Sequence, residues 1–571
     1  MKSFLKWLAI ILTVIFILIF AAVITISSLI DNEPIVEDNS YLHISLSGTM
    51  AEYEAPDPLE EAFGQTHLNM KKVRDILEKA AVDNRINGII LNVNGFSVGF
   101  GNLHELHSYI KKYKESGKKI YAYLETPGIR EYYAAAACDS IFMAPSGTLF
   151  LQGFNAEITF YKSFLKMIGV EAEFMQIGRY KNAPDPYIRD NMSPYQREVL
   201  QSILNQYFDD LLNTIANTRG IAVDKLKKLI NKEGAFTAKE ALKYHFVDNL
   251  RFKNEIISLF KKEDKSLPSR VDAPDYARVP ASSLDIRNKS RIAVINCTGV
   301  IASGSDTDDP LFGKTAGSST LVKNIRKAAK SKSIKAIIFR IDSPGGSALA
   351  SDLIWKAVKE AAEKKPVIAS VVDLGASGGY YITTPVDSFF AASGSLVGSI
   401  GIFAGKFNIR GLYDKLRLKS ESVRIGDKAT LFSVMDPWTK EERSVIYKII
   451  NDFYTDFVQK VADARKLSYE QVDNLGRGHV WTSEQAFENG LIDHIGGFYD
   501  AVKAAKKMAG IDADESVRLS YYPQKKSFFG NVLNKVEAMI SVEIDPLKSV
   551  TKQFEKIQNK PMALMPYKID W

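Results

Sequence analysis

A serine in the turn 375–381 has a sequence context suited to a nucleophile. The turn reads Gly-Ala-Ser-Gly-Gly-Tyr-Tyr and follows an apolar stretch that predicts a buried strand ending at Asp373. Small residues permit a sharp turn into a helix, which would leave the Ser377 hydroxyl beside unpaired backbone N–H groups. The spacing is not Gly-x-Ser-x-Gly, and helix capping by Ser377 is the alternative interpretation.

A second glycine-rich turn, at 342–347, also lies between a predicted strand and a predicted helix. It reads Asp-Ser-Pro-Gly-Gly-Ser. Glycines let the backbone approach a ligand closely, and the N–H groups at the start of a helix suit a phosphate or a tetrahedral oxyanion. Neither the Walker spacing nor Gly-x-Gly-x-x-Gly is present, which favours an oxyanion over a phosphate. A plain strand-to-helix turn is the alternative.

The histidine positions disfavour a histidine as general base for such a serine. None of the seven histidines lies in a nucleophile motif, so a Ser-His-Asp triad is disfavoured. His104 and His107 have a metal-like spacing but no third ligand nearby, and we expect no metal site. The two cysteines, Cys138 and Cys297, cannot form a disulfide framework or a four-ligand zinc site.

The chain contains an internal duplication. Segment 86–94 resembles 334–342, and segment 132–140 resembles 380–388 at the same offset. We therefore predict two homologous halves. In each half, short β-rich apolar runs alternate with amphipathic segments, which predicts an α/β fold with a largely parallel sheet.

The halves differ where the chemistry is expected. The turn 375–381 corresponds to 126–131, where Ile129 or a neighbour replaces the serine, so only the second half can supply the nucleophile. Conversely, Lys181 aligns with Ala429 of the second half. A lysine desolvated beside a serine can act as a base once its pKa falls by about 3. The alternative is an ordinary surface lysine, since sequence does not reveal burial.

The first residues predict a membrane anchor. Residues 7–30 carry no charge and would span roughly 36 Å as a helix, more than the hydrocarbon core of about 30 Å. Lys2 and Lys6 precede this run, and Asp31 and Glu33 follow it, so the positive-inside tendency places the N-terminus in the cytoplasm and the rest of the chain outside. A cleaved signal peptide, the alternative, would have a shorter apolar region.

The remaining composition is that of an ordinary globular protein. Of 571 residues, 46% are hydrophobic and 25% charged, with a net charge of +7. These values exclude a disordered chain, a collagen-like fibre and a polytopic membrane protein, and they give little support for nucleic-acid binding.

We expect an anchor with its flank over 1–39, domains over 40–262 and 291–520, a linker over 263–290 and a tail over 521–571.

Four motifs in order carry a family resemblance. They are GRYKNA with IRDNMSP (178–183 and 188–194), SPGGS (343–347), GASGGYY (375–381) and GSLVGSIGI (394–402). With the anchor and the duplication, they resemble the long, tandem-domain form of the signal peptide peptidase A (protease IV) family over about residues 1–515. The resemblance implies a ClpP/crotonase-like fold of ββα repeats in each half.

The resemblance also implies the catalytic residues of a Ser/Lys dyad. In this chain Ser377 would be the nucleophile and Lys181 the general base. The oxyanion would be held by backbone N–H groups of Gly346, with Gly345, and of Gly378. No metal or organic cofactor is implied. Leu396 is a candidate for an apolar pocket together with Val397 and Ile400, although core packing explains these residues equally well.

The expected protein is a membrane-anchored serine endopeptidase that cleaves remnant signal peptides. Its expected partners are peptide substrates, the lipid bilayer through residues 7–30 and further copies in a homotetramer, with no nucleic acid. The expected location is the bacterial inner membrane, with a single span and with the catalytic domains on the periplasmic side. One alternative is an inactive peptide-binding membrane scaffold. The other is a crotonase-like acyl-CoA enzyme, which the expected extracytoplasmic location disfavours.

Overall fold

The structure is a computed structural model that describes residues 34–55, 67–261, 266–284, 290–309, 313–524 and 561–565, together with Trp7 and Val14. Of the predicted anchor 7–30, all but Trp7 and Val14 lie outside the described residues. Within the described ranges, no helix has both the length and the hydropathy needed to cross a membrane.

The first half folds around a six-stranded parallel sheet with the order β8-β4-β3-β2-β1-β9. β2 is buried along most of its length because both faces of this sheet are covered. The elements in chain order are β1 (Ser40–Thr49), α3 (Met70–Val82), β2 (Ile86–Ser97), α4 (Phe100–Lys114), β3 (Lys119–Leu124), α5 (Ile129–Ala136), β4 (Ser140–Met143), β5 (Thr148–Phe150), α6 (Lys162–Ile168), β6 (Glu171–Ile177), α7 (Asp185–Ile188), α8 (Pro194–Arg219), α9 (Val223–Glu233), β7 (Ala235–Thr237), α10 (Ala238–Lys243), β8 (Asn249–Leu250), α11 (Lys253–Ile256), β9 (Ser269–Asp272) and α12 (Ala273–Tyr276).

The second half repeats this plan around an eight-stranded sheet with the order β20-β18-β16-β14-β10-β22, in which β17 also pairs with β16 and β21 pairs with β17. The strands from β22 to β16 pair in parallel, so the predicted α/β architecture with a largely parallel sheet is confirmed. The elements are β10 (Ser290–Thr298), β11 (Val300–Ala302), β12 (Asp308–Asp309), β13 (Gly313–Gly317), α13 (Ser318–Lys330), β14 (Ile334–Ser343), β15 (Gly345–Ser347), α14 (Ala348–Ala362), β16 (Val367–Ala376), α15 (Gly378–Tyr381), β17 (Ser388–Ala391), β18 (Leu396–Gly398), β19 (Ile402–Asn408), α16 (Arg410–Lys415), α17 (Lys440–Arg465), α18 (Tyr469–Leu475), β20 (Val480–Thr482), α19 (Ser483–Glu488), β21 (His494–Ile495), α20 (Phe498–Met508), β22 (Val517–Tyr522) and β23 (Met562–Leu564).

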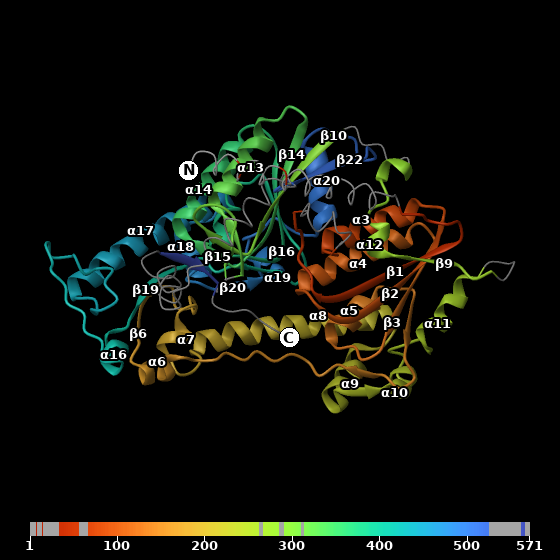
Figure 1. Ribbon diagram of the computed structural model, residues 1–571, viewed down its shortest axis with the longest axis horizontal. Helices are drawn as coiled ribbons and strands as arrows, with labels where there is room; N and C mark the ends of the chain where they lie inside the picture. The colour runs from red at the N-terminus through yellow and green to blue at the C-terminus, as the bar shows by residue number, and fades with distance from the viewer. Residues whose placement is uncertain are drawn as a thin grey trace.

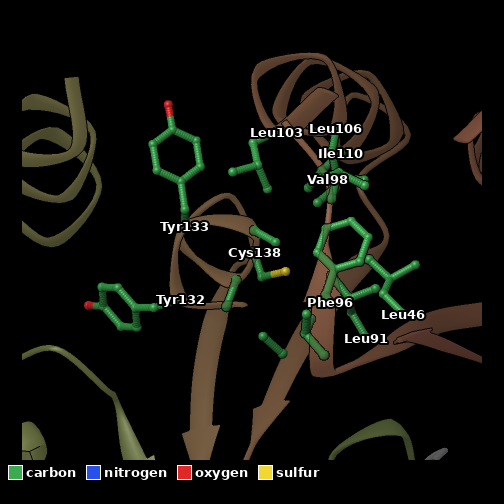
Figure 2. Close-up of a cluster of buried hydrophobic side chains, with 14 of the residues drawn as sticks. Leu46, Leu91, Phe96, Val98, Leu103, Leu106, Ile110, Tyr132, Tyr133 and Cys138 are labelled. Atoms are coloured by element: carbon green, nitrogen blue, oxygen red, sulfur yellow. The ribbon is translucent and has the colours of Figure 1, made fainter. Parts of the chain in front are cut away.

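The core of the first half lies between its sheet and the helices that cover it. Figure 2 shows Leu46 and Leu91 of the sheet close to Leu103 and Leu106 of α4. The thiol of Cys138 is buried in the same cluster, and this burial raises its pKa. A thiol that stays protonated is a poor nucleophile, as expected of a cysteine that only fills core volume.

A third, seven-stranded sheet joins the two halves, with the order β12-β13-β11-β15-β23-β19-β6. β6 of the first half pairs antiparallel with β19 of the second along its whole length, from Ile177 opposite Ile402 to Glu171 opposite Asn408. The long helix α8 also reaches both halves, contacting α5 in one and β20 in the other (Figure 1). The residues that follow β6 therefore lie beside the second half.

A buried ion-pair network lies across the interface of the two halves. The guanidinium of Arg340, on β14, donates to Glu52 at 2.9 Å and to both carboxylate oxygens of Glu105 at 2.8 and 2.5 Å. It also donates to the Ser370 hydroxyl at 2.8 Å. Both carboxylates belong to the first half, and all three charged side chains are at most 3% exposed. The charges are thus satisfied only while the halves stay packed.

The segments predicted as linker and tail contribute strands to the sheets. Within 263–290, β9 pairs with β1 and its Asp272 contacts His43 at 2.9 Å. Within 521–571, residues 562–564 form β23 in the third sheet. The sequence shows neither strand, because a strand of three or four residues is too short to display a hydrophobic period.

Arg340→Met should destabilise the protein strongly. It leaves two buried carboxylates without a counter-charge, a change that costs about 3–5 kcal/mol. The midpoint of urea unfolding measures this loss. Arg326→Met is the matched control, because Arg326 forms a half-exposed pair with Glu360, and such pairs contribute less than about 1 kcal/mol. Equal midpoints for the two variants would show that the network does not hold the halves together.

Candidate active site

Ser377 lies in a strained turn between β16 and α15. Its backbone has φ +55 and ψ −114, outside the conformations that most L-residues adopt, and its N–H donates to the Gly398 carbonyl at 2.7 Å. The side chain is completely buried. The following helix packs tightly, because a Cβ on Gly379 would lie 2.6 Å from the Ser343 carbonyl oxygen. Strain of this kind is concentrated at functional sites.

Lys181 reaches this serine from the first half. The turn after β6 passes Gly178, at φ +109, where a Cβ would lie 2.3 Å from the Arg477 backbone. The Tyr180 N–H then donates to the Arg477 carbonyl at 2.9 Å. Nζ of Lys181 ends 2.7 Å from Oγ of Ser377, with the whole lysine side chain buried. The structure thus brings together two residues 196 positions apart.

Burial lowers the pKa of Lys181 well below that of an exposed lysine. The sole cause is desolvation, since the ammonium loses its hydration and no carboxylate bonds to it in the described structure. Asp185, close in sequence, accepts instead from Asn182 at 2.8 Å. Asp190 accepts from Ser163 at 2.7 Å. An amine without a counter-ion in a dry site is neutral at a pH where an exposed lysine is charged.

Ser399 is a site residue that the sequence reasoning missed. Nζ of Lys181 donates to its hydroxyl at 2.9 Å and to its carbonyl oxygen at 3.1 Å. Ser399 is buried and has φ +51, and its own N–H donates to the His479 carbonyl at 2.6 Å. The only signal in the sequence was its place in the motif 394–402, which assigns it no role.

The three predicted oxyanion donors differ in availability. The N–H of Gly345 donates to the Ser343 hydroxyl at 3.2 Å, which removes it from the set. Gly346 has φ +156, and a Cβ there would lie 2.0 Å from the Ile301 carbonyl oxygen, so only glycine fits. Gly378 is the first residue of α15, where backbone N–H groups lack helical acceptors. Gly346 and Gly378 remain as candidate donors.

The corresponding turn of the first half is closed by a carboxylate. Glu131 accepts from the N–H of Gly128 at 3.0 Å with one oxygen and from the N–H of Phe96 at 3.0 Å with the other. Ile129 begins α5 where the second half has the serine turn. Ala429, aligned with Lys181, lies in an irregular segment at the protein surface. The donors of this turn therefore bind an anion, but the anion is part of the chain.

His104 and His107, the pair with metal-like spacing, bond to residues outside the site. Among the described residues, no histidine side chain hydrogen-bonds to Ser377 or Lys181. His104 contacts Asp210 at 2.8 Å and Tyr133 at 3.0 Å, and His107 bonds to the Tyr133 carbonyl. In the described part of the chain, no group of three or more potential ligands could hold a metal ion.

A buried serine hydroxyl against a desolvated amine, with backbone N–H donors alongside, has the components of a serine hydrolase. The profile of peptidase family S49 matches the chain twice, over residues 112–267 and 359–512. The chain belongs to this family and is a serine protease.

Relatives match over most of the chain. "Serine protease SPPA, chloroplastic" of Arabidopsis thaliana is 32% identical over 514 residues, covering 88% of this chain and 74% of that protein. "Protease 4" of Haemophilus influenzae is 28% identical over 525 residues, covering 88% and 84%. Among solved structures, a mutant of ClpP1 from Listeria monocytogenes aligns with 37% of this chain and 94% of its own, at 17% identity and a TM-score of 0.25.

Lys181→Met should slow the covalent labelling of Ser377 by a fluorophosphonate about 100-fold or more, because it removes the candidate base while keeping the volume. Mass spectrometry of the labelled peptide measures the rate. Lys79→Met is the control: Lys79 is also buried, its pKa is lowered to about 8 by burial, and it bonds only to carbonyls remote from Ser377. Labelling of Lys181→Met at the wild-type rate would exclude Lys181 as the base.

Ser399→Ala should lower kcat about tenfold with little change in KM, because Ser399 positions the amine and need not touch the peptide. Peptidase activity should rise with pH through the pKa of Lys181, since only a neutral amine can accept the hydroxyl proton of Ser377. The Ser399 hydroxyl accepts from the amine and favours its charged form, so its loss should move the acidic limb of the kcat profile to lower pH. Ser395→Ala, a buried serine that bonds to Ala392 instead, should leave the limb in place. If the acidic limb of the kcat profile stays in place in Ser399→Ala, Ser399 does not affect the pKa of Lys181 and only packs against it.

Proposed function

We propose that this protein is a membrane-anchored serine endopeptidase that uses Ser377 as nucleophile and Lys181 as general base, and that it cleaves remnant signal peptides. The observation that carries the proposal is the 2.7 Å contact between Nζ and Oγ inside a site closed to water. The unit β14–β15–α14 supports the ββα repeat of a ClpP/crotonase-like fold.

The hydrogen bonds of Lys181 suit a neutral amine. Such an amine has two N–H donors and one lone pair, and it has three partners here. Its donors satisfy the two oxygen atoms of Ser399, which leaves the lone pair for the hydroxyl proton of Ser377. After proton transfer, the same two oxygens stabilise the ammonium.

The reaction then follows in two stages. Oγ of Ser377 bonds to the scissile carbonyl carbon as its proton passes to Nζ of Lys181. The oxyanion accepts from the N–H groups of Gly346 and Gly378. The C–N bond breaks as Lys181 returns the proton to the leaving amine, and water hydrolyses the resulting ester with Lys181 again as base.

The proposed setting is a bacterial inner membrane. The uncharged run 7–30, preceded by Lys2 and Lys6, supports one membrane span with a cytoplasmic N-terminus and periplasmic catalytic domains. The relative from Enterococcus faecium named "Putative signal peptide peptidase SppA" supports signal peptides as substrates. Assembly as a homotetramer is part of the same proposal.

Turnover of a quenched fluorogenic signal-sequence peptide tests the proposal, using the full chain in phospholipid vesicles. Ser377→Ala should reduce turnover at least about 1,000-fold, because it removes the nucleophile. A matched peptide with a polar central segment should be cleaved more slowly than the apolar one.

Four outcomes would contradict all or part of the proposal. Peptide binding without turnover in the wild type, or turnover unchanged in Ser377→Ala, would favour the scaffold. Ser377-dependent cleavage of an acyl-CoA thioester with no peptide cleavage would favour the acyl-CoA enzyme. Equal cleavage of the apolar and polar peptides would keep the protease but reject signal peptides as its class of substrate.

A further inference from the structure

The chain's own residues 561–565 lie in the groove beside the catalytic pair. β23 (Met562–Leu564) is inserted in the third sheet between β15 and β19, the strands labelled in Figure 1. In this sheet β15 and β19 each pair with β23 and not with each other. The groove is therefore a gap between two strand edges, of the kind that an extended peptide fills by β-strand addition.

The segment is bonded to β15 at both ends. The N–H of Met565 donates to the Pro344 carbonyl at 2.7 Å, and the N–H of Ala348 donates to the Pro561 carbonyl at 3.1 Å. Between these bonds, Ala563 lies opposite Gly346, one of the two remaining oxyanion donors. Residues 561–565 thus pair with the edge of β15, to which an extended substrate would also pair.

Two methionine side chains anchor the segment. Met562 is 6% exposed and Met565 is 5% exposed. Met565 belongs to a buried cluster that includes Ala376, the residue before Ser377, and Leu396. Val397 and Ile400 belong to the core of the second half instead, so of the three candidate pocket residues only Leu396 shares a cluster with Met565. An unbranched, flexible side chain suits such an irregular apolar site.

We propose that residues 561–565 are a tethered peptide ligand of this groove, bound in the place of substrate and in competition with it. This inference rests on the proposed function and adds the class of peptide the site takes: an extended backbone with a flexible apolar side chain, methionine or leucine, in the buried cluster that contains Ala376 and Leu396. A substrate binds only to the fraction of molecules whose groove is free.

Tethering makes the competition effective. A ligand on the same chain acts at an effective concentration that reaches the millimolar range, far above that of a dilute free peptide. Release of the segment should therefore increase the apparent affinity for an added peptide without any change in the groove itself.

The test compares peptide binding in chains that cannot cut the probe. All variants carry Ser377→Ala, and the probe is a fluorescein-labelled Pro-Met-Ala-Leu-Met peptide followed by anisotropy. Met562→Asp with Met565→Asp should release the segment, because a carboxylate is costly to bury in an apolar site. We expect its dissociation constant for the probe to fall about tenfold relative to Ser377→Ala alone.

Controls keep the inference separate from folding and from the proposed function. Met508→Asp makes the same change at a methionine that is 44% exposed, outside the groove, and should leave the constant unchanged. A chain ending at residue 560 should bind the probe as tightly as the double variant. Equal dissociation constants with and without the segment would overturn the inference, whereas loss of Ser377-dependent turnover in the wild type would overturn the proposed function instead.

Discussion

Removal of one lysine amine from water is the constraint on which the site depends. A surface lysine beside a serine would be charged, and it could not accept the hydroxyl proton. Here the pairing of β6 with β19 carries Lys181 across the interface into a closed environment, and burial alone lowers its pKa. In the described structure no carboxylate bonds to the amine. This arrangement suits a base, because a buried carboxylate would raise the pKa of Lys181 and favour its charged form.

The duplication explains how one chain obtained two equivalent turns with different roles. Both halves place a strand-to-helix turn with free N–H groups at the end of a parallel strand. In the first half Glu131 fills this turn with its own carboxylate, and the turn becomes structural. In the second half Ser377 occupies the turn, and Gly346 and Gly378 are the candidate donors for an oxyanion. The first half then contributes through the segment after β6, where the second half carries only Ala429 in a surface segment.

Sequence alone predicted the elements that have a period and the residues that break the symmetry between the halves. Ser377 and Lys181 could be selected as candidates because each is missing from the other copy, and the structure places them in contact. The features that were not predictable depend on contacts between distant segments. Ser399 is one serine among many until Lys181 reaches it, and the diversion of Gly345 depends on the rotamer of Ser343. β23 has three residues, and it is a strand only because the edges of β15 and β19 flank it.

The catalytic site has a free-energy cost, and the packing of the two halves must offset it. Ser377 and Ser399 both have positive φ, and such residues cost about 1–3 kcal/mol each. A desolvated lysine adds a further penalty, since burial disfavours the charged form of Lys181 and lowers its pKa well below that of an exposed lysine. The buried network of Arg340 and the β6–β19 pairing hold the halves together against these costs. Any loosening of that interface would admit water to Lys181 and raise its pKa, so the packing of the halves sets the basicity of the amine as well as its position.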